Sequence, residues 1–151
     1  MKENIYKTHN CGELRMSDVG KSVRLAGWVN SIRKLGGLTF VTLRDHFGLT
    51  QLVLKDENMI NGVNKESTIS VSGTVLERYS KNPKMETGDI EVEVNSLTVL
   101  GKCQSVLPFE IADAPNTKEE LRLKYRYLDL RNPDTHELIV KRAKMLNFAR
   151  N

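Results

Sequence analysis

Five strand-like segments separated by short turns lie between residues 22 and 100, and they restrict the possible folds more than any other feature of the sequence. Each segment is rich in Val, Ile, Leu and Thr, which favour strands, and is bounded by Gly and Asn, which favour turns. The segments cover residues 22–33, 38–44, 49–54, 68–78 and 89–100. We therefore expect an all-β domain of five strands.

Alternation of apolar and polar side chains is clearest in the fifth segment. Successive side chains of a strand point to opposite faces, so an apolar set and a polar set separate. We expect Ile90, Val92 and Val94 to face inward, and Glu91, Glu93 and Asn95 to face outward. Each outward carboxylate is then either available to a ligand or simply solvated.

The stretch between the third and fourth strands, residues 55–67, is polar and carries Met59, Ile60 and Val63 at the spacing of one short helix. Five strands with a helix between the third and the fourth is the element order of an OB-fold, a small Greek-key barrel. Element order alone leaves an SH3-like barrel, or another small barrel, open as the alternative.

The first two turns indicate how the first three strands pair. We expect Arg33 to pair with Leu38 and Arg44 to pair with Leu49. One face then takes five apolar residues that suit a barrel interior: Trp28, Val41, Leu43, Leu52 and Leu54. The other face carries an aromatic ring among polar side chains: Phe40, Arg33, Ser31, Thr42 and Gln51. A slip of one residue would exchange the two sets and expose the apolar one, so the pattern favours this arrangement.

Phe40 is therefore an aromatic ring on the outer face of a strand. A surface ring that packs under a loop or against the tail is common, and that interpretation stays open. The neighbours of Phe40 favour a different interpretation, in which this face binds unpaired bases. An aromatic ring stacks on such bases, a guanidinium contacts phosphate, and a primary amide matches a Watson–Crick edge. OB-folds bind oligonucleotides on this face of their second and third strands.

The net charge of +4 does not by itself indicate a nucleic-acid partner. Residues 1–117 hold 14 Lys and Arg against 14 Asp and Glu, whereas residues 118–151 hold 9 against 5. The whole excess therefore lies in the tail. A nucleic-acid site on the strand-rich part must be a local cluster of charge rather than a broad basic field.

Helical patterns replace strand patterns after a breaker-rich connection at residues 104–116. Thr117 and Glu120 have capping-box spacing, which predicts a helix start there, and a second helix is expected over residues 135–151. We expect three parts: a barrel domain over 1–104, a helical linker over 105–134, and the first helix of a further domain over 135–151. Because the last helix leaves its apolar residues unpartnered, we expect the sequence to be a piece of a longer protein.

Several functional classes find no support in the sequence. No apolar run approaches the roughly 18 residues of a membrane span, and the first residues lack the apolar core of a signal peptide, so we expect a cytoplasmic protein with no membrane partner. Cys11 and Cys103 are then expected to be reduced thiols. We expect no metal site and no catalytic residues, because the chain lacks a metal-ligand cluster, a P-loop and a nucleophile–base pair.

Three stretches resemble one family. Residues 11–54, beginning "CGELRMSDVGKSVRLAGWV", resemble the N-terminal anticodon-binding domain of bacterial aspartyl-tRNA synthetases. Residues 87–100, "TGDIEVEVNSLTVL", resemble the last strand of that domain, and residues 120–133, "ELRLKYRYLDLRNP", resemble the hinge that precedes the catalytic domain. Asparaginyl and lysyl relatives share the "GWV" and "F…LRD" elements, and lysyl enzymes carry a similar "RYLDL", so their anticodon domains stay open as alternatives.

The resemblance implies an OB-fold that binds the aspartate anticodon, G-U-C, in tRNA. Phe40 occupies the stacking position of the family, Gln51 the position that pairs with the central uracil, and Glu91 the position that faces the first base, guanine. Arg33 and Asn82 fall where the family contacts the third base and the nearby backbone.

Two further positions complete the expected site. Ser31 stands where many bacterial members have arginine, which removes one expected contact. Thr42 is expected to lie opposite Gln51 and to hold its amide.

The resemblance also implies a parent enzyme that uses ATP and magnesium to attach aspartate to its tRNA and that forms homodimers. The ATP motifs of the family lie beyond residue 151, so we expect this chain alone to need no cofactor, to lack ligase activity and to be compatible with a monomer. Two other functions remain open: a stand-alone OB-fold that binds single strands without sequence preference, and a protein-interaction barrel with Phe40 as a hydrophobic anchor.

Overall fold

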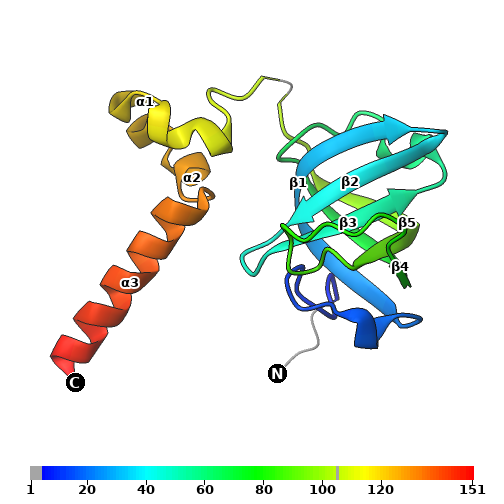
Figure 1. The fold of residues 1–151 in the computed structure, drawn as a ribbon. Helices are drawn as coiled ribbons and strands as arrows, with labels where there is room; N and C mark the ends of the chain where they lie inside the picture. The colour runs from blue at the N-terminus through cyan, green and yellow to red at the C-terminus, as the bar shows by residue number, and fades with distance from the viewer. Residues whose placement is uncertain (1–4, 105) are drawn as a thin grey trace. The chain divides into compact units, whose positions relative to one another are not determined.

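Five strands form a closed barrel in the order β1-β2-β3-β5-β4 in the computed structural model, which describes residues 5–104 and 106–151 (Figure 1). The strands are β1 (Ser22–Leu35), β2 (Leu38–Arg44), β3 (Leu49–Leu54), β4 (Thr68–Glu77) and β5 (Ile90–Gly101). All neighbours are antiparallel except β3 and β5, which run parallel. The predicted all-β barrel of five strands is confirmed.

Two short 3-10 helices accompany the barrel. The first, η1 (Met16–Asp18), precedes β1, and the second, η2 (Glu57–Ile60), lies between β3 and β4, where one short helix is predicted. The Asp56 side chain accepts a hydrogen bond from the backbone N–H of Asn58 and so caps η2. Ile60 is buried against the barrel core, which fixes the helix to it.

The barrel interior contains most of the side chains that the sequence places there. Val41, Leu43, Leu52 and Leu54 are fully buried, as are Ile90 and Val92 of β5. Glu91 and Glu93 lie on the outer side of β5, half-buried, so the predicted faces of this strand are confirmed. These apolar side chains therefore fill the barrel interior, and the polar side chains predicted to face outward lie on its outer surface.

The predicted burial of Trp28 in the interior is wrong. A β-bulge between Val29 and Ser31 shifts the pairing of β1 with β2, so that Val29 pairs with Leu43 and points inward, while Trp28 pairs with Arg44 on the outer side. A bulge inserts one extra residue into a strand and exchanges its faces beyond that point. A strict alternation through the bulge therefore assigns Trp28 to the wrong face.

The predicted partner of Arg33 is also wrong. Arg33 pairs with Phe40, and Leu35 pairs with Leu38 across a two-residue turn made by Gly36 and Gly37. Both glycines have positive φ, 60° and 78°, which suits a tight hairpin turn. The difference from the expected pairing is two residues, and a shift of two keeps every side chain on its expected face. Arg33 and Phe40 therefore still share the outer face.

The bulge is held by an ion pair on the outer side of the barrel. The Arg44 guanidinium donates to both carboxylate oxygens of Glu66, at 2.8 and 2.7 Å, and to Oδ1 of Asn30 at 2.9 Å. The Glu66 backbone, at the positive φ of 63°, donates its N–H to the carbonyl oxygen of Val29 at 2.7 Å. Side chain and backbone thus fix the same bulge from two directions.

The chain divides into two compact units, Met1–Ser105 and Val106–Asn151. The second unit contains η3 (Ile111–Asn116), α1 (Glu119–Lys124), α2 (Arg126–Asp129) and α3 (Pro133–Arg150). Its small core consists of Phe109, Ile111, Ala114 and Leu128. The Asp129 carboxylate is fully buried and accepts hydrogen bonds from Arg122 and Arg126.

Helix starts in the second unit differ from the predicted ones. Thr117 caps no helix start, because its hydroxyl donates to the carbonyl oxygen of Asp113 and α1 begins after Lys118. The last helix begins two residues earlier than expected, at Pro133, where the Asn132 side chain accepts from two backbone N–H groups. Whether residues 135–151 begin a catalytic domain stays a prediction.

Candidate nucleic-acid interface

A hollow of about 820 Å³ lies on the outer face of the barrel and brings together side chains from β1, β2, β3 and β5 and from the start of the β4–β5 loop. Four of the predicted site residues line it: Arg33, Phe40, Gln51 and Glu91. We refer to this space as the outer hollow. Its lining combines an aromatic ring, an amide, a carboxylate and guanidinium groups.

Strand pairing explains why these four side chains meet. Phe40 of β2 pairs with Arg33 of β1 on one side and with Val53 of β3 on the other. The next row on the same face contains Gln51, which hydrogen-bonds to Glu91 of β5. Two adjacent rows of outward side chains thus form the floor of the outer hollow.

Gln51 is the most enclosed polar side chain of the outer hollow. Its residue is only 4% exposed, although it lies on the outer face of the barrel. Its Nε2 donates to Oε2 of Glu91 at 2.9 Å, and its Oε1 accepts a long hydrogen bond, 3.5 Å, from Nη2 of Arg33. The amide is therefore placed between an acceptor and a donor.

Three predicted site residues are not among the described lining residues of the outer hollow. Ser31 and Thr42 pair with each other on β1 and β2, and Thr42 also pairs with Gln51, but none of the described lining residues is Ser31 or Thr42. Asn82 lies in the β4–β5 loop, where its Oδ1 accepts from the backbone N–H of Lys84 at 3.1 Å. It too is absent from the described lining.

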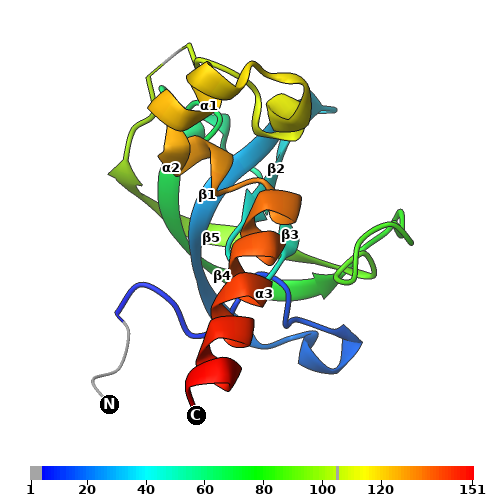
Figure 2. The ribbon, with the colours of Figure 1, turned by 90° about the vertical axis from the view of Figure 1, so that its left-hand side faces the viewer.

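The sequence analysis missed the residues that the β4–β5 loop contributes. Figure 2 shows this loop projecting from the barrel, and Arg78, Tyr79 and Ser80 at its start line the outer hollow. Nη1 of Arg78 is buried and has no hydrogen-bond partner among the described residues. The Tyr79 side chain is fully exposed. A basic–aromatic pair directly after a strand is the signal that could have found them.

The charge of the outer hollow is positive although the barrel as a whole is neutral. Arg33, Lys34 and Arg78 line it together with a single carboxylate, Glu91. Lys34 forms an exposed ion pair with Glu57 at 2.7 Å, which leaves the two guanidinium groups as the main cations directed to a ligand. This is the local cluster of charge that a nucleic-acid site on a neutral body requires.

The lining can bind an unstacked nucleotide in three ways. A base can stack on Phe40, the amide of Gln51 and the carboxylate of Glu91 can bond to base edges, and the guanidinium groups can contact phosphate or base. Among residues 5–104 and 106–151, no three His, Cys, Asp or Glu side chains are grouped closely enough to hold a metal ion. Nor does the described chain contain a helix long and apolar enough to cross a membrane.

Comparisons with known proteins place the barrel in a family of nucleic-acid-binding domains. Residues 23–100 match the family described as OB-fold nucleic acid binding domain. The chain is 45% identical over 147 residues to an aspartate–tRNA ligase of Bacteroides thetaiotaomicron, and the match covers 93% of this chain and 25% of that protein. It is 44% identical over 153 residues to an aspartate–tRNA(Asp/Asn) ligase of Phenylobacterium zucineum, covering 97% of this chain and 26% of that one.

A solved structure of a related enzyme has a similar fold. The asparaginyl-tRNA synthetase of Pyrococcus horikoshii matches with a TM-score of 0.80 and 28% identity, over 97% of this chain and 35% of that one. The chain thus spans about a quarter of the length of the ligases that it matches.

Proposed function

This chain belongs to the family of OB-fold nucleic acid binding domains, and on that premise we propose that it binds the anticodon loop of an aspartate transfer RNA. The observation that carries the proposal is the outer hollow. It combines an aromatic ring, Phe40, with an amide, Gln51, and a carboxylate, Glu91, in a hollow that Arg33, Lys34 and Arg78 also line.

Each base of the G-U-C anticodon has a partner in the outer hollow. The ring of Phe40 stacks on a base, and the amide of Gln51 offers one donor and one acceptor to the central uracil. The carboxylate of Glu91 accepts from N1–H and N2–H₂ of guanine, a pair of adjacent donors that no other base presents on its Watson–Crick edge. Arg33 contacts the third base or its phosphate.

The parent protein is, on this proposal, an aspartate–tRNA ligase that uses ATP and magnesium to attach aspartate to its tRNA. Support comes from the identity of about 45% to such ligases over 93% of this chain. The match covers 25% of that protein, and we infer that the residues present here serve recognition of the tRNA. We expect purified chain to show no aspartate-dependent exchange of pyrophosphate into ATP.

Binding of anticodon stem-loops tests the proposal. We expect the chain to bind a G-U-C stem-loop at least tenfold more tightly than loops with another first or middle base, measured by filter binding at two salt concentrations. Equal affinity for all loops would favour an OB-fold that binds single strands without preference. Preference for the G-U-U loop would favour asparagine tRNA, and the absence of any salt-dependent binding would favour a protein-interaction barrel.

A further inference from the structure

The hydrogen bond between Gln51 and Glu91 joins the two side chains that are assigned to different bases. Nε2 of Gln51 lies 2.9 Å from Oε2 of Glu91, and Oε1 of Gln51 lies 3.5 Å from Nη2 of Arg33. Gln51 is only 4% exposed, so its amide forms few hydrogen bonds with water and depends on its protein partners. The three residues come from three strands, β3, β5 and β1, and meet in the outer hollow.

We propose that Glu91 is a positioning residue for Gln51, and that it thereby controls selection of the middle base as well as the first. The inference rests on the proposed function and deepens it, because it makes the two base preferences depend on one another. Only Oε2 of Glu91 accepts from Gln51, and each carboxylate oxygen can accept more than one hydrogen bond. The carboxylate can therefore hold the amide and still accept from both donors of guanine.

Hydrogen-bond chemistry allows only one orientation of the amide. A carboxylate only accepts and a guanidinium only donates, so the NH₂ end of Gln51 has to face Glu91 and the carbonyl end has to face Arg33. Rotation of the amide by half a turn would place oxygen against oxygen and N–H against N–H. In an enclosed place both unpaired contacts are unfavourable.

A fixed amide is what discrimination between uracil and cytosine requires. Uracil presents a donor at N3 and an acceptor at O4, whereas cytosine presents an acceptor at N3 and a donor at N4. An amide that rotates freely satisfies either base, because it can exchange its own donor and acceptor. An amide held by Glu91 keeps one N–H and its carbonyl in fixed places, so it matches uracil and opposes cytosine.

Thr42 is the side chain that the sequence predicts to hold the amide. It pairs with Gln51 across β2 and β3, but no hydrogen bond between the two side chains occurs among the described contacts. The carboxylate of Glu91 makes the close contact instead, at 2.9 Å. Position 91 is therefore where the middle-base preference can be altered without touching Gln51.

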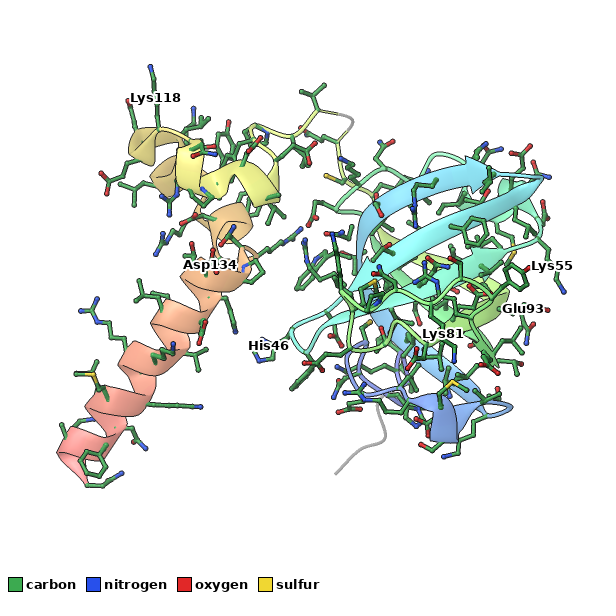
Figure 3. The ribbon with its side chains drawn as sticks, in the orientation of Figure 1. His46, Lys55, Lys81, Glu93, Lys118 and Asp134 are labelled. Carbon is green, nitrogen blue, oxygen red and sulfur yellow. The ribbon has the colours of Figure 1, made fainter. Side chains whose placement is uncertain are left out.

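Glu93 provides a matched control on the same strand. It lies two residues after Glu91 on the same face of β5, and its Oε1 accepts from Nζ of Lys55 at 2.8 Å (Figure 3). It pairs with Val53 and does not line the outer hollow among the described residues. Glu93→Gln thus repeats the chemical change of Glu91→Gln with no effect expected on the amide.

Stem-loops with an abasic first position separate positioning from direct reading. In such a loop Glu91 has no base to read, so any effect of Glu91→Gln on the middle base must pass through Gln51. We expect the wild-type chain to prefer U over C at the middle position at least tenfold, with guanine or with an abasic site before it. Glu91→Gln should reduce that preference at least fivefold in both loops, and Glu93→Gln should leave it unchanged.

A second measurement needs no RNA. In ¹H–¹⁵N spectra of the free protein, the side-chain amide of Gln51 should shift in Glu91→Gln and stay in place in Glu93→Gln, while the backbone spectrum reports an intact fold. Retention of the wild-type U-over-C preference by Glu91→Gln in abasic loops would overturn the inference and leave the proposed function standing. If the wild-type chain itself showed no preference for U over C, both the inference about Glu91 and the proposed function would be contradicted.

Discussion

Arg33 and Phe40 are direct partners across β1 and β2, and both side chains line the outer hollow. Phe40 is half-buried, and a guanidinium beside its ring gives a ligand two contacts at once, since a base that stacks on the ring brings its phosphate close to the cation. The pair therefore predicts a stacking contact that depends on the ring of Phe40 and not on aromatic surface in general.

Phe40→Ala should weaken binding of a G-U-C stem-loop by about 1–3 kcal/mol, the usual contribution of one base stacked on an aromatic side chain. Filter binding measures the loss, and circular dichroism checks that the fold is retained. Phe47→Ala is the matched control, because Phe47 is 56% exposed in the β2–β3 turn and is absent from the described lining of the hollow. Equal effects of both substitutions would mean that Phe40 only packs against its neighbours.

Arg78 is predicted to contact RNA phosphate, because it lines the outer hollow and Nη1 of its guanidinium has no hydrogen-bond partner among the described residues. Arg78→Ala should weaken binding of all stem-loops alike and reduce the slope of log affinity against log salt by about 1. Lys84→Ala, in the same loop but outside the described lining, should leave the slope unchanged. If Arg78→Ala instead relaxed the preference for one base, its contact would be to that base.

Much of this interface follows from the sequence, and the parts that do not have identifiable physical causes. Alternation alone places Phe40 and Gln51 on the outer face, and a pairing error of two residues leaves that face intact. Alternation places Trp28 on the wrong face, because a bulge exchanges the faces of β1. The amino-acid composition of the strand does not reveal this bulge.

Arg78 is the last residue of the predicted strand over 68–78, but β4 ends at Glu77, so the position of Arg78 depends on how the β4–β5 loop folds. Here the backbone N–H of Arg78 donates to the carbonyl oxygen of Asp89 at 2.9 Å, which joins the two ends of the loop. Gly88 is required in the same loop, because a Cβ at that position would lie 1.8 Å from the carbonyl oxygen of Asn82. Contacts of this kind are tertiary and have no local pattern.

Loss of the Arg44–Glu66 pair should destabilise the barrel strongly. The side chains are only 12% and 5% exposed, and removal of one partner leaves a buried charge uncompensated, which costs about 3–5 kcal/mol. We expect Glu66→Ala to lower the free energy of unfolding by that amount in urea denaturation. The control is Glu57→Ala, which breaks the exposed pair with Lys34 and should cost about 0–1 kcal/mol. Equal losses would show that the buried pair does not stabilise the bulge.

Cys11 is predicted to be an unreactive thiol in the native state. It is fully buried in the barrel core, and burial, with Asp45 nearby as the second cause, raises the pKa of the Cys11 thiol far above its usual range. Because the thiolate is the reactive form, iodoacetamide at pH 8 should alkylate the half-buried Cys103 much faster than Cys11. Mass spectrometry of the labelled peptides measures both rates, and in urea the two should become similar. Native labelling of Cys11 as fast as Cys103 would contradict the prediction.

The same pKa shift of Cys11 predicts how stability changes with pH. A group whose pKa is raised by folding binds its proton more tightly in the native state. Its contribution to stability is therefore fully present below the pKa of an unfolded thiol, about 8.5, and is lost as the pH rises above that value. The free energy of unfolding of the wild-type chain should thus fall more steeply between about pH 8.5 and pH 10 than that of Cys11→Ala, which lacks the thiol. Other groups titrate alike in both proteins, so their effect cancels in the difference between the two slopes of unfolding free energy against pH. Equal slopes would mean that the Cys11 thiol ionises as readily in the folded barrel as in the unfolded chain.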